Sequence, residues 1–337
     1  MNYTDKQKLQ ALVHTIDLNY RVTGLYAAYL ERCPELITSG MINALTGDGD
    51  ITVKDALVAI LCEAFDLDDE RGGDDRRLIR SYLRESVRVL DPKRYTENPY
   101  YKNIKIEGFK DGSWEFKWES YPAFRGVIAN DMIIKPDYSE IPPLGFFEEE
   151  FRFPAVLEGG NEWMTLTPVD LDTSDEAIER AHGKVITFGL GLGYYAYMVS
   201  EKESVESITV IEKSPEVIGL FKKHILPQFK HKDKVRVICA DAFEYAEFEM
   251  PKEKYDFAFV DTWRDASDGA PMYERMKPLE AKNPETEFSY WIENFLVSRL
   301  RALKFEELYK AVMDDAPNAP KTYAEFIKEL KIYGRDH

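Results

Sequence analysis

The chain has 337 residues, 44% of them hydrophobic and 31% charged, and its formal net charge at pH 7 is −17. This length is sufficient for two or three domains with buried cores. The strong negative charge argues against broad binding to the phosphate backbone of nucleic acids. No apolar run approaches the roughly 20 residues that a membrane-spanning helix needs, so no membrane partner is expected.

The three cysteines, Cys33, Cys62 and Cys239, share no metal-ligand spacing, and Cys239 lies in a predicted buried strand. The first residues of the chain lack a signal-peptide pattern. Together these features predict reduced thiols in a cytoplasmic protein. The five histidines form no recognisable metal-binding or nucleophilic set, so no metal is expected.

Residues 1–98 are predicted to form a helical N-terminal domain. Apolar residues recur at three- and four-residue spacing, and Leu9, Leu12, Ile16, Tyr20 and Leu25 are predicted to lie roughly on one helix face. Thr52-Val-Lys-Asp55 has the pattern of a capping box before an apolar run, and residues 76–90 are predicted to be helical. We expect this domain to serve as a lid or substrate platform, or as the contact of a homodimer.

Residues 99–171 are predicted to form a small antiparallel β region. Residues 103–109 and 113–118 alternate between apolar and polar side chains on either side of Asp111-Gly112, which is a hairpin signal. Residues 151–157 and 163–166 flank Gly159-Gly-Asn161 and predict a second hairpin.

Residues 172–284 have the pattern of a Rossmann-like α/β core, a doubly wound and mostly parallel sheet. Thr173-Ser-Asp-Glu176 is predicted to cap a short helix that leads into the first strand. The predicted strands are 184–188, 207–211, 234–239 and 255–260. A glycine cluster follows the first strand, and an acidic residue closes each of the others, namely Glu212, Asp241 and Asp261. In such a sheet, ligands bind at the carboxyl ends of the strands, where these groups collect.

The glycine cluster and its acidic companions predict a site for a nucleoside-like cofactor. Gly189, Gly191 and Gly193 let the backbone turn sharply and approach a ligand closely. Glu212 follows Gly191 by about 20 residues, the usual separation for a carboxylate that binds ribose hydroxyls. Asp241 is a candidate acceptor for an adenine amino group or a cofactor ammonium, although it also has the position of a helix cap.

Residues 180–271 resemble the S-adenosylmethionine-binding core of class I methyltransferases, and within that group they are most similar to spermidine synthase and its relatives. The resemblance is carried by residues 185–193 (VITFGLGLG), 205–218 (VESITVIEKSPEVI), 235–242 (VRVICADA) and 255–262 (YDFAFVDT). Thr187 stands where many methyltransferases have an acid, a departure shared with the aminopropyltransferases. The chain also lacks the Tyr-His-Glu-Met element of that branch.

The resemblance implies a role for each matching residue. The segment containing Gly189, Leu190, Gly191 and Gly193 would line the methionine end of the cofactor. Glu212, next to Lys213, would bind the ribose, and Asp241 and Ala242 would flank the adenine. Asp261 would stand beside the reacting centre and would orient or deprotonate the attacking nucleophile.

The loop after Asp261 supplies three candidate substrate residues, Trp263, Asp265 and Asp268. Packing alone accounts equally well for Trp263, and roles in the loop or as helix caps account better for the two aspartates. Residues 285–337 are predicted to be a helical tail, and no strand pattern follows Asp261. The sheet is therefore expected to be truncated after its fourth strand, or completed by another segment.

Three functions fit these observations. The first is an S-adenosylmethionine-dependent methyltransferase that acts on a small-molecule or protein acceptor. The second is an aminopropyltransferase that uses decarboxylated S-adenosylmethionine and an amine. The third is a non-catalytic protein that binds the cofactor or uses the fold for assembly.

Overall fold

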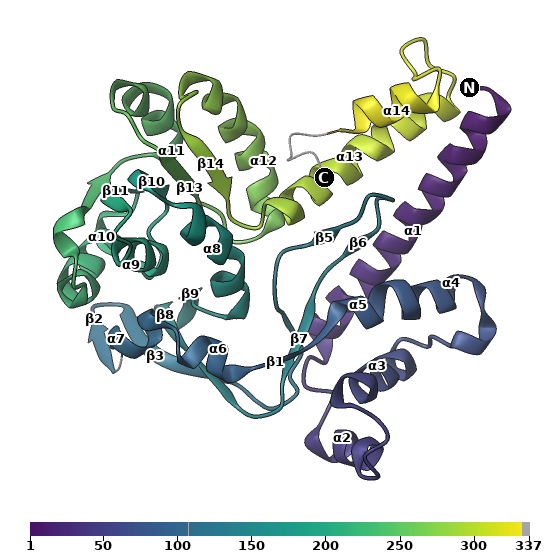
Figure 1. The fold of residues 1–337 in the computed structure, drawn as a ribbon, viewed down its shortest axis with the longest axis horizontal. Coiled ribbons are helices and arrows are strands. Elements are labelled where there is room, and N and C mark those ends of the chain that lie inside the picture. The colour runs from purple at the N-terminus through teal and green to yellow at the C-terminus, as the bar shows by residue number, and fades with distance from the viewer. Residues whose placement is uncertain (107, 332–337) are drawn as a thin grey trace. The chain divides into compact units, whose positions relative to one another are not determined.

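The computed structural model describes residues 1–106 and 108–331 (Figure 1). They form two compact units. The first comprises Met1–Leu90, Pro122–Glu150 and the chain from Asn294 onward, and the second comprises Asp91–Tyr121 and Phe151–Glu293. The units cut across the four consecutive segments expected from the sequence, because residues 122–150 and the C-terminal helices pack with the N-terminal helices. None of the described helices combines the length and apolar character required to cross a membrane.

The first unit is mainly helical. Its elements in chain order are α1 (Tyr3–Arg32), α2 (Ser39–Thr46), α3 (Val53–Ala64), η1 (Asp69–Arg71), α4 (Gly73–Arg77), η2 (Leu78–Leu83), α5 (Arg84–Ser86), β1 (Val87–Leu90), β4 (Val127–Ile128), β5 (Ile133–Ile134), β6 (Glu140–Ile141), β7 (Leu144–Phe147), α13 (Glu293–Met313) and α14 (Tyr323–Leu330). Thr52 caps α3 as predicted, since its hydroxyl oxygen accepts a hydrogen bond from the Asp55 N–H at 3.1 Å.

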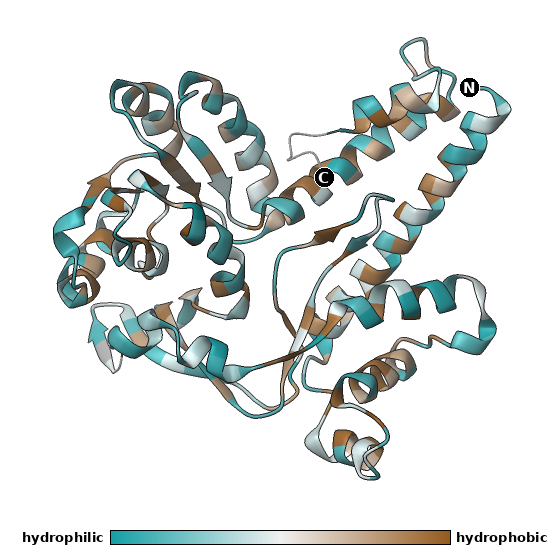
Figure 2. Ribbon diagram, viewed as in Figure 1, coloured by the Kyte–Doolittle hydropathy of each residue, from teal (hydrophilic) through white to brown (hydrophobic). Residues whose placement is uncertain are grey.

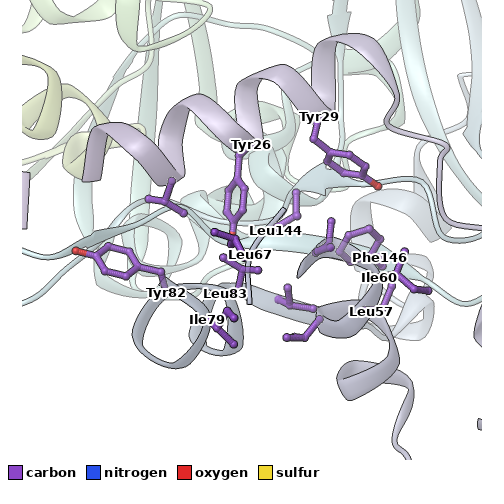
Figure 3. Packing of buried hydrophobic residues seen from close by; sticks show 14 of the residues in the cluster. Tyr26, Tyr29, Leu57, Ile60, Leu67, Ile79, Tyr82, Leu83, Leu144 and Phe146 are labelled. Carbon is purple, nitrogen blue, oxygen red and sulfur yellow. The ribbon is translucent and has the colours of Figure 1, made fainter. Parts of the chain in front are cut away.

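The core of the first unit forms around α1. Figure 3 shows Tyr26 and Tyr29 projecting from α1 into a cluster with residues of α3 and β7, including Leu57 and Phe146. The predicted apolar face of α1 packs in a second cluster with α13 and α14. Tyr20, expected on the same face, is instead exposed, and its hydroxyl donates to Glu306.

One helix prediction in this unit is wrong at its end. Residues 87–90 were expected to continue a helix, but they form β1, which pairs in parallel with β7 in the register Val87↔Leu144. The partner strand lies more than fifty residues away in the sequence, so local periodicity carries no sign of the pairing. Val87 and Leu90 are buried, which explains why this short segment is apolar.

The second unit contains the two main sheets. Its elements in chain order are α6 (Pro92–Thr96), α7 (Pro99–Asn103), β2 (Phe109–Asp111), β3 (Trp114–Tyr121), β8 (Phe151–Glu158), β9 (Asn161–Thr165), α8 (Pro168–Arg180), β10 (Gly183–Phe188), α9 (Tyr194–Ser200), β11 (Val205–Glu212), α10 (Pro215–Leu220), η3 (Phe221–Ile225), η4 (Leu226–Gln228), η5 (Lys232–Lys234), β12 (Val235–Cys239), α11 (Ala242–Glu244), η6 (Tyr245–Glu249), η7 (Met250–Lys252), β13 (Phe257–Val260), α12 (Ala266–Met276), η8 (Lys277–Lys282) and β14 (Glu287–Tyr290).

Both predicted hairpins are present in one antiparallel sheet, in the order β2-β3-β8-β9. Asp111 pairs with Trp114 across the first turn, and Glu158 pairs with Asn161 across the second. Gly159 and Gly160 both have positive φ, which is the requirement of a two-residue hairpin turn. The first strand is displaced from its expected range of 103–109, because α7 extends to Asn103 and β2 begins only at Phe109 and includes Asp111, which was predicted in the turn.

The predicted α/β core is confirmed as a parallel sheet in the order β12-β11-β10-β13-β14. The strands consist largely of apolar residues (Figure 2), as expected for strands covered on both faces. The chain winds outward in one direction from β10 through β11 to β12, then returns to β13 on the other side of β10. With right-handed crossovers, this reversal places helices on both faces and opens a crevice at the carboxyl ends of β10 and β13.

The sheet does not stop after its fourth strand. Residues 287–290 form β14, parallel to β13 with Val260 opposite Tyr290. The sequence Glu-Phe-Ser-Tyr is short and mixes polar with apolar residues, so its pattern predicts no strand; the predicted C-terminal helix begins only at Glu293. Within residues 1–106 and 108–331 this sheet has five strands, whereas the class I methyltransferase sheet that the sequence resembles has seven.

Two local predictions also need correction. The helix before β10 begins at Pro168, not near residue 173, and Thr173 lies inside it. Cys239 is exposed, because it lies at the end of β12, an edge strand of the sheet. All three cysteines are free thiols.

Candidate functional site

A cavity of about 780 Å³ opens at the carboxyl ends of the parallel strands in the second unit. Its lining includes residues at or just after the carboxyl end of each of four neighbouring strands, namely Gly189, Glu212, Asp241 and Asp261. Every predicted site residue lines it except Gly193 and Asp265. The other predicted residues in the lining are Leu190, Gly191, Lys213, Ala242, Trp263 and Asp268. The sheet topology therefore brings together groups that are distant in the sequence.

The glycine loop after β10 is held very close to the end of β13. Gly189 has φ of +99°, and a Cβ at this position would lie 1.8 Å from the backbone carbonyl oxygen of Asp261. Gly191 has φ of +52°, and a Cβ there would lie 2.5 Å from Cε of Met164. Only glycine fits these two positions without displacement of a neighbour, which leaves the backbone of the loop bare along the cavity.

Gly193 serves the packing of α9. It is the N-cap of α9 with φ of +75°, and a Cβ on it would lie 2.5 Å from the ring of Phe221. This glycine therefore permits close packing between α9 and η3, and the structure does not place it on the cavity.

Glu212 ties the glycine loop to the end of β11. One carboxylate oxygen accepts from the Ser214 N–H at 2.9 Å, and the other accepts from the Leu190 N–H at 3.3 Å. A carboxylate has about four lone-pair sites, so Glu212 retains capacity to accept from the hydroxyls of a ligand. Its neighbour Lys213 is exposed at the edge of the same cavity.

Asp241 acts as the predicted helix cap. Its Oδ1 accepts from the backbone N–H groups of Phe243 and Glu244 at 2.9 and 3.0 Å. Both bonds go to one oxygen, so the other carboxylate oxygen keeps its capacity as an acceptor. The cap fixes the orientation of the side chain at the cavity edge, next to Ala242.

Asp261 lies at the end of β13, where it lines both the main cavity and a smaller inner chamber of about 30 Å³. Burial, together with the negative charges of Asp170 and Glu212, raises the pKa of its carboxyl to about 8. A carboxyl group with such a pKa exchanges a proton near neutral pH, which is the property of a general base.

Asp170 is the most important residue that the sequence did not reveal. It lines both cavities with Asp261, and burial raises the pKa of its carboxyl to about 6. Its Oδ2 accepts from the N–H and the hydroxyl of Thr167, at 2.7 and 2.8 Å, in a capping box that starts α8. The sequence does contain a signal, because Thr167-Pro-Val-Asp170 combines proline at the first helical position with an acid at the third.

Three residues of the loop after β13 make contacts that stabilise the loop or the start of α12. Trp263 is buried, lines the cavity, and donates from Nε1 to the Trp291 carbonyl at 3.3 Å. Asp265 is the N-cap of α12, and Asp268 accepts from the Asp265 N–H at 3.0 Å in a capping box. The two aspartates therefore serve as caps, as favoured from the sequence, while Asp268 also reaches the cavity lining.

The antiparallel sheet contributes one wall of the cavity through β9, whose residues Glu162, Trp163, Met164 and Thr165 line it. Trp291, just after β14, lines it from another side. The sequence did not predict that β9 and Trp291 line the cavity, because their positions depend on contacts between distant segments. Hairpin composition gives no sign that Met164 faces a glycine loop.

The charge of the lining is mainly negative. The acidic residues are Glu162, Asp170, Glu212, Asp241, Asp261 and Asp268, against the basic residues Lys213 and Arg264. Neither basic residue lines the inner chamber, which Asp170 and Asp261 both do. The cavity thus has the electrostatic character of a site for a cationic ligand. The described residues contain no group of three His, Cys, Asp or Glu arranged to hold a metal ion.

The sequence matches no protein-family model and no curated protein. Among solved structures, the chain is similar to a spermidine synthase in complex with the transition-state analogue AdoDATO, at 16% identity and a TM-score of 0.30. It is also similar to spermidine synthase from Thermotoga maritima, at 15% identity and a TM-score of 0.31. Each alignment covers 45% of this chain and 58% of the spermidine synthase.

A third similar structure is precorrin 8w decarboxylase from Methanobacterium thermoautotrophicum, at 19% identity and a TM-score of 0.27. That alignment covers 42% of this chain and 67% of the other. At these identities and TM-scores, the Rossmann-like assignment rests on the strand order and the parallel registers described above.

Proposed function

We propose that the protein is a transferase whose donor is an S-adenosylmethionine-type cofactor, and that it transfers a methyl group to a small-molecule or protein acceptor. The proposal rests on one observation, which is that a single cavity is lined by Gly189 and Gly191 of the glycine loop and by Glu212, Asp241 and Asp261. The cavity volume of about 780 Å³ lies in the range of small-molecule and cofactor sites.

The residues present suit the parts of such a cofactor. Glu212 presents acceptor oxygens for the two ribose hydroxyls, and Asp241 presents one for the adenine amino group. The glycine loop offers the backbone of Gly189 and Gly191, which carry no side chains, to the methionine end of the cofactor. When bound, the cofactor supplies an electrophilic carbon attached to a sulfonium sulfur.

The contribution of the chain to the reaction is positioning and proton transfer. Asp261 accepts the proton of the acceptor nucleophile as the nucleophile forms its bond to carbon and the carbon–sulfur bond breaks. Trp263, Trp291 and the residues of β9 wall the site and limit the access of water. Holding the nucleophile in line with the bond that breaks supplies much of the rate enhancement in a displacement of this kind.

Aminopropyl transfer from decarboxylated S-adenosylmethionine to an amine is the second candidate, and a specific observation favours it. The inner chamber is lined by Asp170 and Asp261 and by no lysine or arginine. A donor chain that ends in an ammonium group suits such a chamber better than one that also carries a carboxylate. Thr187, at the position where many methyltransferases have an acid, lines the same chamber.

Calorimetric titration of the protein with S-adenosylmethionine, its decarboxylated form, S-adenosylhomocysteine and NAD tests the proposal. Micromolar binding of S-adenosylmethionine and S-adenosylhomocysteine, followed by turnover in an acceptor screen, supports methyl transfer. A clear preference for the decarboxylated form shifts the assignment to aminopropyl transfer. Binding without turnover supports a cofactor-binding protein without catalysis, and binding of none of the adenosyl compounds refutes the proposal.

A further inference from the structure

We propose that Asp170 and Asp261 form a carboxyl pair that holds one proton between them in the ligand-free site and releases it when an organic ammonium group enters the inner chamber. The identity of the ammonium as part of an adenosyl donor rests on the proposed function. The pair itself does not, because it follows from the placement of two carboxyl groups on one small chamber.

The inner chamber is small and polar at one side. Its volume of about 30 Å³ gives room for a water molecule or an ammonium head group, and it adjoins the main cavity through shared lining residues. Asp170 reaches it from α8 and Asp261 from the end of β13. Two neighbouring carboxyl groups do not readily ionise together, because the negative charge of one raises the free energy of ionising the other.

The groups around the pair supply no positive charge. Facing the chamber are Ser174 of α8, Thr187 of β10, and Tyr194 and Tyr195 of α9. Burial raises the pKa of both tyrosines, so they are neutral at physiological pH. The nearest further charges that act on the pair are those of Glu162 on Asp170 and of Glu212 on Asp261, and both are negative.

The two carboxyl groups are not equivalent. The two donors of Thr167 stabilise the charged form of Asp170, which therefore ionises first. The higher pKa of Asp261 comes mainly from its burial, and the charge of Asp170, against which Asp261 then titrates, adds to it. Between the two ionisations the pair carries one proton and one negative charge, and this is its state near neutral pH.

A second observation points to a ligand in the chamber. Tyr195 is only 7% exposed and lines the chamber, and its hydroxyl has no hydrogen-bond partner within the described residues. A buried hydroxyl without a partner is costly. A ligand atom or a water in the chamber would supply the missing partner.

The positions of Asp170 and Asp261 on the chamber determine how many protons are released when a cation binds. The empty pair has one carboxylic acid and one carboxylate. When an R–NH₃⁺ group enters, both carboxyl groups become charged acceptors, and the displaced proton passes to the solvent. Binding of a cation is thus coupled to the release of about one proton, and affinity rises with pH until the pair is ionised without the ligand.

Calorimetry in two buffers of different ionisation enthalpy measures this proton. We expect decarboxylated S-adenosylmethionine to release about one proton per site at a pH between the two ionisations, about 7. The neutral analogue 5′-methylthioadenosine, which fills the nucleoside part alone, should release none. Asp261→Asn should abolish the release and Asp170→Asn should reduce it, whereas Glu244→Gln, which removes an exposed charge outside the cavity lining, should leave it unchanged.

Infrared spectroscopy of the ligand-free protein tests the pair without any adenosyl compound. A carboxylic-acid stretch that titrates near neutral pH in the wild type and is lost or displaced in both asparagine variants supports shared protonation. The absence of such a band overturns the inference even if the adenosyl compounds bind. If the band is present and neither adenosyl compound binds, the pair stands and the proposed function fails.

Discussion

The Cα atom of Gly189 lies so close to the backbone of Asp261 that a methyl group on residue 189 would come within 1.8 Å of the Asp261 carbonyl oxygen. This contact joins the turn after β10 to the end of β13, the two strands between which the crevice opens. The absence of a side chain at Gly189 therefore has two effects. It exposes the backbone to a ligand, and it lets Asp261, the proposed base, lie close to the glycine loop.

Gly189→Ala should destabilise the protein by about 2 kcal/mol or more, because it adds a clash with rigid backbone to the strain of a positive φ. Thermal unfolding measures the loss. Gly160→Ala is the matched control, since Gly160 has φ of +86° and open space around its Cβ position. It should cost only about 1 kcal/mol. Equal losses in the two variants would contradict the importance of the contact with Asp261.

Gly191→Ala should be milder than Gly189→Ala, because the added methyl group meets the flexible end of Met164 and not backbone. Met164→Ala in the same chain removes that obstacle. The double variant should therefore be more stable than the sum of the two single losses predicts, by about 0.5 kcal/mol or more. A double-mutant cycle from denaturant unfolding measures this coupling, and strict additivity would argue against the contact.

Glu212→Ala should weaken cofactor binding by about 1–3 kcal/mol, the cost of losing hydrogen bonds to a charged group. The loss also frees the Leu190 and Ser214 amides, so the folded state must be checked by circular dichroism. Glu212→Gln keeps one acceptor oxygen and should fall between the wild type and the alanine variant in calorimetric titration. Unchanged affinity in a well-folded alanine variant would remove Glu212 from the site.

Asp261→Asn should lower turnover about 100-fold or more even at saturating cofactor, because an amide cannot take up the proton of the nucleophile. Steady-state kinetics after an acceptor is found, with calorimetric binding in parallel, separate the loss of turnover from any change in binding. Full activity in this variant would show that Asp261 is not the base.

The pH dependence of stability gives a prediction that requires no substrate. Asp261 has an unfolded-state pKa of about 4 and a folded-state value of about 8. The unfolded chain thus loses its proton first, and stability falls as the pH rises between these values. Asp261→Asn removes this penalty, so its melting temperature relative to the wild type should rise from pH 5 toward about pH 8. A difference that is constant with pH would mean that the carboxyl has an ordinary pKa.

Asp170→Asn should shift the pH profile of activity to lower pH, because the negative charge of Asp170 raises the pKa of Asp261. The midpoint of the profile for kcat/KM measures the free enzyme. Glu244→Gln controls for the loss of one surface charge and should leave the midpoint in place. A midpoint that does not move in the Asp170 variant, or that moves upward, would contradict coupling between the two carboxyl groups.

The sequence predicted the parts of the core that consist of strong local patterns. The strands ending at Phe188, Ile211, Cys239 and Val260 are apolar runs with a glycine or an acid at a fixed place, and the structure has strands at all four. The strand β14 could not be predicted from the sequence, since four mixed residues at a sheet edge carry little periodicity, and its parallel partner β13 is separated from it by α12.

The sequence predicted those site residues that lie at the ends of neighbouring strands. Gly189, Glu212, Asp241 and Asp261 each lie at or just after the end of a strand, and parallel pairing brings these ends together. Met164 and Asp170 reach the cavity from a hairpin and from the start of α8, and their placement depends on how these elements pack on the sheet. Gly193 belongs to the same glycine motif, yet the space it leaves is used by Phe221.

The capping box of α8 links the protonation state of the site to the rigidity of a helix. Asp170 begins α8 through its bonds from Thr167, and its negative charge near the N-terminus also suits the helix dipole. Any event that fixes this charge, such as entry of a cation into the chamber, should tighten the first turn of α8. Slower amide hydrogen exchange in that turn on ligand binding would make the helix an internal reporter of the occupancy of the cavity.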